Sequence, residues 1–208
     1  MAQQYQPNPY GGYRYAVGRD LSRVDWNRVY DLIVRLVPEF RNAGLYDTYR
    51  EGVNRVLAGH GIVWELTEDG KLQRVLPTSA QIQIQEAIQE LNDSRFSAAA
   101  QLFRDARDAY NDRPRRDRDA CANAFDAMES VAKVVFNMPS ATFGNVLVHI
   151  RAGNLLTSEI VNVLDTINTL RNRKFGHGMQ TPFDLSPAEV DFTYLTCIGE
   201  ILLFARRP

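Results

Sequence analysis

The chain has 208 residues, with 24 basic and 25 acidic side chains and a formal net charge of -1. Hydrophobic residues make up 45% and charged residues 24%, a composition that excludes a wholly disordered, collagen-like or disulfide-scaffold protein. A chain of this length buries enough surface to fold without a disulfide or metal staple. The near-zero net charge argues against a general nucleic-acid coating protein, so any contact with RNA or DNA should be confined to a local patch.

No membrane segment and no signal peptide are predicted. The longest apolar stretch, residues 198–205, is too short to cross a bilayer and contains Glu200. The first 15 residues are polar and lack the apolar core of a signal peptide. We therefore expect a cytoplasmic protein without a membrane partner. Cys121 and Cys197 lie within helical patterns, where they are best interpreted as small buried hydrophobic residues.

The amino-terminal part is predicted to contain an arm and two helices. Residues 1–20 include several prolines and glycines, so we expect a flexible arm there. Apolar residues at helical spacing then predict a helix over residues 24–37, ended by Pro38. A second helix is expected over residues 46–58, closed by Gly59.

A β-hairpin is predicted directly after these helices. The β-prone runs 62–66 and 72–76 are joined through Asp69 and Gly70, a pair that is typical of hairpin turns. Two strands alone are marginally stable in water, so the hairpin must pack on neighbouring helices. The sequence therefore predicts a small α+β module over residues 21–77, made of two helices and one hairpin.

The remainder, residues 78–208, is predicted to form an antiparallel helical bundle. Ser186, Pro187 and Glu189 form a capping-box signature at the start of its last helix. The expected helices cover residues 80–91, 94–110, a stretch with Pro114 in its first turn, 143–150, 158–173 and 186–205. The predicted fold class is thus mostly α, with a small amino-terminal α+β module.

Common catalytic motifs are absent from the sequence. The Gly70-Lys71 pair lacks the flanking pattern of a phosphate-binding loop, and there is no G-x-S-x-G motif. The three histidines, His60, His149 and His177, are far apart and show no metal-ligand spacing. We therefore expect neither a metal ion nor another cofactor.

The most informative segment is residues 170–178, Leu-Arg-Asn-Arg-Lys-Phe-Gly-His-Gly. Arg171, Arg173 and Lys174 gather at the carboxyl end of a predicted helix, where exposed carbonyls and the helix dipole favour cations. That structural role is one explanation of the three residues. The other is a phosphate site, in which the glycine after the helix lets His177 return toward Arg171. An arginine can neutralise a phosphodiester, and a histidine can transfer protons near neutral pH.

Three pieces of the bundle resemble the HEPN superfamily and the carboxy-terminal domain of abortive-infection proteins. The HEPN motif is Arg, then a polar residue, then His, and Arg171, Asn172 and His177 match it. The other pieces are Leu-Asn-Asp-Ser-Arg-Phe at residues 91–96 and Ala-Phe-Asp-Ala-Met-Glu-Ser-Val-Ala-Lys at residues 124–133. All three occur in the order and spacing of the family.

The resemblance, which covers about residues 80–205, implies a HEPN-like helical bundle that forms a homodimer with the motifs facing across a two-fold axis. It implies cleavage of RNA without a metal, by attack of a ribose 2′-hydroxyl. It also implies a role in phage defence or a toxin–antitoxin system, with an antitoxin or sensor protein as a further partner.

Carried onto this chain, the resemblance makes Arg171 the group that stabilises charge on the phosphate. Asn172 would orient the reacting groups, and His177 would act as general acid or base. Arg173 and Lys174 would be auxiliary phosphate contacts. Some family members keep the fold without activity, so two alternatives stay open. One is a non-catalytic domain that binds nucleic acid or nucleotide. The other is a protein-interaction or dimerisation module in which the histidine is incidental.

Three further groups also have two interpretations each. Glu129 and Lys133 are four residues apart and stabilise their helix, or Glu129 orients the basic site. His149 is a packed histidine at a helix end, or a ligand. The run Arg-Pro-Arg-Arg-Asp-Arg at residues 113–118 is a solvated helix start, or it holds a nucleic-acid backbone.

Overall fold

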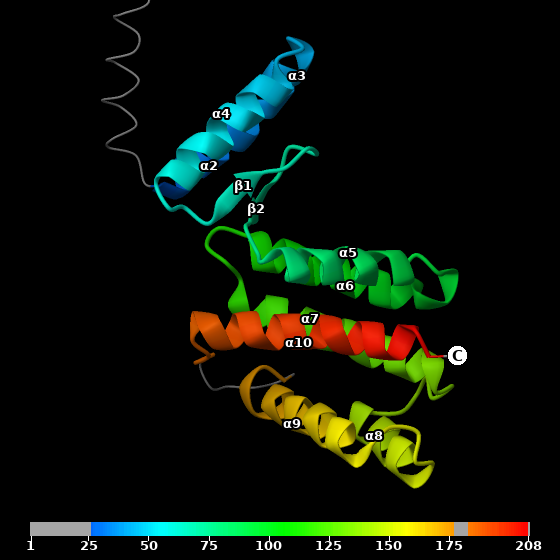
Figure 1. Cartoon of the computed structure of the whole chain (residues 1–208). Helices are drawn as coiled ribbons and strands as arrows, with labels where there is room; N and C mark the ends of the chain where they lie inside the picture. Colours follow the sequence, from blue (N-terminus) through cyan, green and yellow to red (C-terminus); the bar gives the residue numbers. More distant parts are fainter. Residues whose placement is uncertain (1–25, 177–182, 208) are drawn as a thin grey trace, which may run out of the picture. The chain divides into compact units, whose positions relative to one another are not determined.

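The computed structural model describes residues 26–176 and 183–207, which are mostly helical and contain one two-stranded antiparallel sheet (Figure 1). The arm predicted over residues 1–20 lies outside the described residues. The chain divides into two compact units between Val75 and Leu76, two residues before the boundary placed from the sequence. No helix in the described part is long and apolar enough to cross a membrane.

The described part of the amino-terminal unit, residues 26–75, consists of three helices and the hairpin. Its elements are α2 (Trp26–Arg35), α3 (Val37–Asn42), α4 (Tyr46–Gly59), β1 (Trp64–Leu66) and β2 (Leu72–Arg74). Helix α4 packs against α3 and β1. Among the described residues, the buried core of this unit consists of Tyr30, Val37, Leu57, Leu66 and Leu72.

The first helix differs from its prediction. A single helix over residues 24–37 is wrong, because α2 ends at Arg35 and α3 begins at Val37 with Pro38 in its first turn. Proline has no N–H to donate, and the first turn of a helix is where that loss has no consequence. Pro38 therefore starts a helix and does not end one.

Helix α4 also ends differently from its prediction. Gly59 belongs to the helix, and the left-handed residue is Gly61, with a φ of +66°. The Gly61 N–H donates to Ala58 O at 3.0 Å, and the Ile62 N–H donates to Leu57 O at 2.9 Å. This is a Schellman-type end, so Gly61 is the residue that stops the helix.

The predicted hairpin is confirmed, with strands shorter than expected. Leu66 lies opposite Leu72, and the Gly70 N–H donates to Thr67 O at 3.0 Å across the turn. Gly70 has a φ of +87°, and a Cβ added there would lie 2.7 Å from Cγ1 of Val37. A side chain is therefore excluded at Gly70 both by the backbone conformation and by the packing of α3.

The second unit is a helical bundle (Figure 1). Helix α7 packs against α6 and α10, α10 also packs against α5, and α8 packs against α9. The elements are α5 (Thr78–Glu90), η1 (Ser94–Phe96), α6 (Ser97–Asn111), α7 (Asp117–Val135), α8 (Phe143–Ala152), α9 (Ser158–Lys174) and α10 (Pro187–Ala205). Pro114 precedes α7, so its predicted place in the first turn of that helix is wrong.

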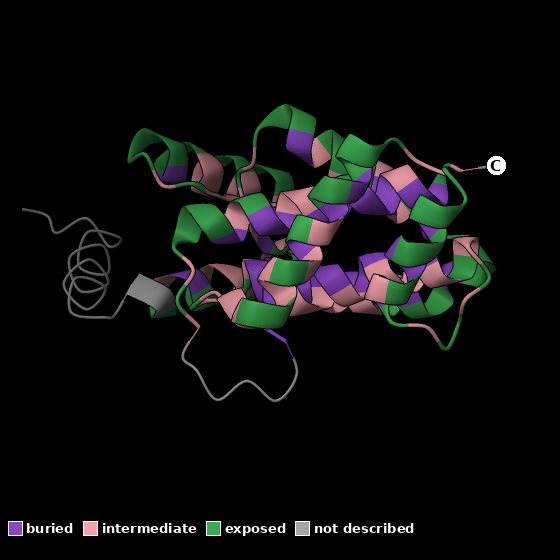
Figure 2. Cartoon of the chain, turned by 90° about the horizontal axis from the view of Figure 1, so that it is seen from below, coloured by how far each residue is buried: buried purple, intermediate pink, exposed green. Residues whose placement is uncertain are grey.

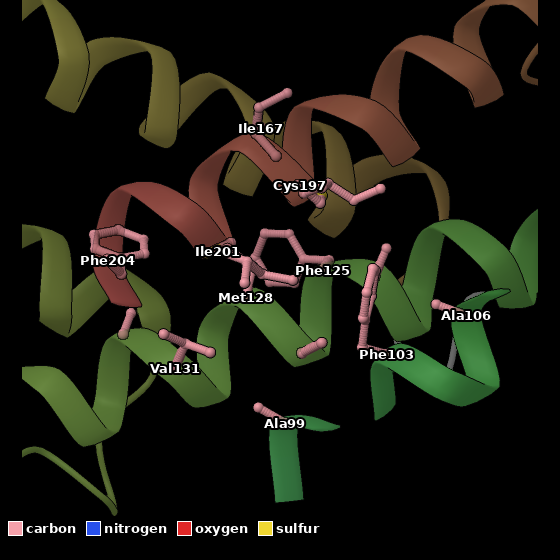
Figure 3. Close-up of a cluster of buried hydrophobic side chains, with 14 of the residues drawn as sticks. Ala99, Phe103, Ala106, Phe125, Met128, Val131, Ile167, Cys197, Ile201 and Phe204 are labelled. Atoms are coloured by element: carbon pink, nitrogen blue, oxygen red, sulfur yellow. The ribbon is translucent and has the colours of Figure 1, made fainter. Parts of the chain in front are cut away.

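Buried residues line the inside of the bundle, while its outer surfaces are exposed (Figure 2). Figure 3 shows part of the core, to which α6 contributes Phe103, α7 contributes Phe125 and Met128, and α10 contributes Ile201 and Phe204. All five residues are at most 2% exposed. The core is therefore built mainly where α7 meets α6 and α10.

Two sequence predictions within the bundle are confirmed. Ser186 caps α10 and forms a capping box with Glu189, with Pro187 in the first turn. Cys121 and Cys197 are both fully buried. Burial raises the pKa of Cys121 to about 12, which keeps the thiol protonated and inert at neutral pH.

Candidate functional site

The candidate site lies at the carboxyl end of α9. The helix ends at Lys174, and the N–H of Phe175 donates to Arg171 O at 3.1 Å. Phe175 is 3% exposed and belongs to the core. Gly176 is also buried, and a Cβ added there would lie 3.3 Å from Arg171 O. Gly176 has no left-handed backbone, so it permits a close approach to the helix end and is not a left-handed helix stop.

Arg171 is held between α9 and α7. Its Nη2 lies 3.6 Å from Oδ1 of Asp126, and its Cζ lies 5.4 Å from the centre of the Phe125 ring. Its Nη1 donates to Oδ1 of Asn172 at 3.3 Å. The side chain remains 20% exposed. The guanidinium is thus oriented by a carboxylate and an aromatic face, and the side chain as a whole keeps one fifth of its surface in contact with solvent.

The other predicted phosphate contacts have different surroundings. Asn172 and Arg173 are exposed. Lys174 donates to both carboxylate oxygens of Asp184, at 2.8 and 3.0 Å, and this hydrogen bonding lowers the pKa of Asp184. Lys174 is therefore directed to the segment before α10, whereas the structure assigns no such partner to Arg173 among the described residues.

His177 lies outside the described residues, so the structure does not test its predicted return toward Arg171. The residue before it is fixed, because Nη2 of Arg118 donates to Gly176 O at 3.3 Å. Arg118 is on α7, as is Asp126. The two residues are eight apart, close to two helical turns, which places them on similar faces of α7. One helix therefore contacts α9 at Arg171 and the chain beyond it at Gly176.

Sequence reasoning missed both Asp126 and Arg118. It considered Glu129 as the acid that orients the basic site, but Glu129 accepts from the Phe143 N–H at 3.0 Å and pairs with Lys133 at 2.9 Å. Its role within the helix is confirmed, and it also caps the start of α8. A signal for Asp126 was its place between the buried residues Phe125 and Ala127, where a charged side chain needs a partner.

The arginine run at residues 113–118 is a solvated helix start only in part, because Pro114 and Arg116 are exposed while Arg115 is not. Arg115 is 9% exposed, donates to Asp117 and Asp191, and lies over the Tyr110 ring at 5.2 Å. It therefore joins the start of α7 to the start of α10. Arg116 is exposed but pairs with Asp112 and Asp119, which are close to it in sequence. Arg115 and Arg116 therefore both have acidic partners within the chain.

The two described histidines lie elsewhere. His60 follows α4 as its capping residue, as expected for a turn, and His149 lies in the last turn of α8 with its ring 6.0 Å from that of Phe136. His149 is exposed, so its predicted packing at a helix end is limited to this edge contact. Within residues 26–176 and 183–207, no cluster of three histidine, cysteine or acidic side chains is arranged to hold a metal ion.

Comparison of the chain with known protein families, with curated proteins and with solved structures finds no match. The function must therefore be argued from the chemistry at the end of α9.

Proposed function

We propose that the helical unit is a HEPN-like, metal-independent endoribonuclease that acts in phage defence or in a toxin–antitoxin system. The observation that carries the proposal is the setting of Arg171, which is oriented by Asp126 and Phe125 and remains 20% exposed. An oriented guanidinium on a partly exposed side chain is suited to a phosphodiester. This function needs RNA as its substrate. We expect a second copy of the chain and an antitoxin or sensor protein as its other partners.

In the proposed reaction, the 2′-hydroxyl of a ribose attacks the adjacent phosphorus, and the bond to the 5′-oxygen of the next nucleotide breaks. His177 takes the proton of the hydroxyl or delivers one to the leaving oxygen. Arg171 stabilises the additional charge on the phosphate oxygens, and Asn172 orients the reacting groups. Arg173 and Lys174 contact neighbouring phosphates. The products carry a 2′,3′-cyclic phosphate and a 5′-hydroxyl.

A specific observation also favours the alternative of a non-catalytic interaction module. Two of the predicted phosphate-binding cations already have carboxylate partners: Arg171 pairs with Asp126, and Lys174 pairs with Asp184. An anion must compete with these pairs. In this alternative the basic residues hold the end of α9 in place, and the unit acts by binding nucleic acid or another protein.

An RNA-cleavage assay in EDTA separates the two candidates. The parent protein and the variants His177→Ala and Arg171→Ala are incubated with end-labelled RNA of mixed sequence. We expect cleavage by the parent with cyclic-phosphate ends, and a loss of at least about 100-fold in each variant, the usual scale of general acid–base catalysis. Arg104→Ala is the matched control, because Arg104 is an exposed arginine on α6. Folded parent protein that leaves the RNA intact would favour the interaction module.

A further inference from the structure

The amino-terminal unit contains an apolar groove that is lined mainly by α2 and α4. Its volume is about 630 Å³. Helix α2 contributes Tyr30 and Ile33 to the lining, and α4 contributes a stripe that runs over three turns from Thr48 to Val56. Val56 is 59% exposed. The groove therefore leaves a large apolar side chain in water.

The lining of the groove defines what kind of group fits it. No charged residue is among the described residues that line it. The hydroxyl of Tyr49, which also lies in the lining, already donates to Ile33 O at 2.9 Å. A charged group that entered this groove would lose its water and gain no partner of opposite charge. The groove is therefore suited to an occupant that is apolar and uncharged.

Gly52 lies midway along the stripe of α4 and allows a close approach to the helix. A glycine inside a helix is destabilising relative to alanine. Among the described residues, no atom lies within 4 Å of the position that a Cβ would take at Gly52, so the packing of this part of the chain does not require a glycine there. A missing Cβ lets a flat group, such as an aromatic ring, lie against the helix backbone.

The chain itself carries an uncharged and aromatic segment directly before the groove. Residues 1–25 lie outside the described residues and lead into Trp26, the first residue of α2. Residues 1–13 contain no charged side chain, and residues 5–15 contain four of the nine tyrosines of the chain. A tyrosine ring offers a large contact area while few rotatable bonds must be fixed. The composition of this segment thus matches the uncharged groove.

The length of the segment is sufficient for it to reach the groove. The stripe from Thr48 to Val56 is about 12 Å long, a distance that about four extended residues can span. Residues 16–25 can span about 30 Å when extended, which is enough to return from Trp26 along α2. Because the segment is attached to α2, its effective concentration at the groove exceeds that of an unattached peptide. A segment of the same chain is therefore favoured over a free partner of similar composition.

We propose that residues 5–15 bind in the groove of α2 and α4 of the same chain, with a tyrosine ring against Gly52. Binding covers Val56 and adds apolar contacts to a unit in which five of the described hydrophobic residues are buried. The proposal concerns the amino-terminal unit alone, so it does not depend on the chemistry at the end of α9.

The first test is limited digestion of the full chain with trypsin, which cleaves after arginine. Arg14 lies between Tyr13 and Tyr15, so binding of the segment should protect it. We expect cleavage after Arg14 to be at least tenfold faster in Val56→Glu than in the parent, because the substitution places an unpaired charge in the groove.

Val63→Glu is the matched control for this digestion. Val63 is 57% exposed, almost as much as Val56, and does not line the groove. The control should be cleaved as slowly as the parent, and tryptophan fluorescence should show that the unit is folded in both variants. Equal cleavage rates after Arg14 in the parent and in Val56→Glu would overturn the proposal.

A second test identifies the chain that supplies the segment. Tyr5, Tyr10 and Tyr13 are replaced by cysteine in turn, each together with Val56→Cys, in a protein whose native cysteines are buried. At one or more of the three positions, a disulfide within one chain should form at least tenfold faster than with Glu51→Cys. Glu51 is exposed on α4 and points about 140° away from Val56 around the helix.

The rate of cross-linking should not change with protein concentration, because both thiols belong to one chain. If all three positions react equally fast with Val56→Cys and Glu51→Cys, the segment does not bind in the groove. Disulfide-linked dimers that form faster as the concentration rises would show that a second copy supplies the segment. Either result would overturn the proposal.

Discussion

The two units of the chain are stabilised in different ways. The helical unit has a continuous core formed by α5 to α10, with many residues at 0% exposure, including Phe204 and Ile201. Among its described residues, the amino-terminal unit has five buried hydrophobic ones. A core of that size contributes little by hydrophobic burial alone. Comparison of the two units shows how a small unit compensates with specific polar contacts.

Asn54 is the clearest example of such a contact. Its Nδ2 donates to Leu66 O at 3.0 Å, and its Oδ1 accepts from the Leu66 N–H at 2.6 Å. One side chain on α4 thus pairs both backbone groups of a residue in β1. In addition, the Tyr49 hydroxyl donates to Ile33 O at 2.9 Å. These contacts attach the strand and α2 to α4, a role that packing fulfils in the helical unit.

The two units can be followed separately during unfolding. Both tryptophans, Trp26 and Trp64, belong to the amino-terminal unit, so their fluorescence reports on that unit alone. Far-UV circular dichroism reports mainly on the helical unit, which contains most of the helical residues. Each of the following variants is expected to shift the unfolding transition seen by one signal and not the transition seen by the other. A variant that shifts both transitions would contradict the separation of the units.

Phe204→Ala should have the largest effect, and it should act on the helical unit. Phe204 is 0% exposed and makes edge contacts with Phe136 and Phe143, with ring centres 5.9 and 6.3 Å away. Removal of a buried aromatic ring costs about 3–5 kcal/mol of unfolding free energy. Urea unfolding followed by circular dichroism measures the loss. The control Val148→Ala, at an exposed position, should change the midpoint little.

Glu200→Gln should change how the stability of the helical unit depends on pH. Burial raises the pKa of Glu200 from 4.5 to about 8. Between these values the folded state keeps a proton that the unfolded state releases, so stability is full below about pH 4.5 and falls as the pH rises toward 8. The total loss is on the order of 5 kcal/mol. Melting curves at several pH values should show this decline in the parent and not in the variant.

Glu51→Gln, at an exposed position in the other unit, controls for the change of net charge. A Glu200→Gln variant that keeps the full decline of the parent would show that Glu200 does not bind the proton.

Asn54→Ala should destabilise the amino-terminal unit and leave the helical unit unchanged. The change leaves the N–H and C=O of Leu66 without their partners, which costs about 1–3 kcal/mol. Asn54→Asp keeps the acceptor and should retain part of the stability. Tryptophan fluorescence during urea unfolding measures both. Arg55→Ala, at the exposed next position, is the control and should unfold at the same urea concentration as the parent.

Ser186→Ala should have the smallest effect, about 1 kcal/mol, through the loss of the cap of α10. Thr157 offers a matched comparison, because it occupies the same position before α9 but its side chain makes no capping hydrogen bond. Thr157→Ala should therefore leave the melting temperature nearly unchanged. Equal losses in both variants would mean that the capping box does not stabilise α10.

The local features of the fold could be predicted from the sequence. The long helices follow from apolar spacing, the hairpin from Asp69 and Gly70, and the start of α10 from its capping box. The helix ends marked by proline and glycine were harder to predict. Pro38 is compatible with the end of one helix and the start of the next, and both Gly59 and Gly61 were able to stop α4. The outcome depends on the packing of α3 and α4, which spacing does not specify.

The contacts of the candidate site could be predicted only in part. The cations at the end of α9 are evident in the sequence, since they are adjacent. Asp126 and Arg118 are not evident, because they contact the end of α9 only in the folded chain. Asp126 is 45 residues before Arg171, and Arg118 is 58 residues before Gly176. Arg115 was misinterpreted for the same reason, because Asp191 is 76 residues away.

The pair formed by Arg171 and Asp126 has a consequence for salt dependence. A phosphate that binds Arg171 must displace the carboxylate of Asp126, because this arginine is already paired. Asp126 is in this sense an internal competitor. Dissolved ions weaken the attraction of Arg171 for the phosphate and for Asp126 alike, so part of the effect of salt cancels in the exchange. Binding at Arg171 should accordingly be weaker than at an unpaired arginine, but it should also be less sensitive to the ionic strength of the surroundings.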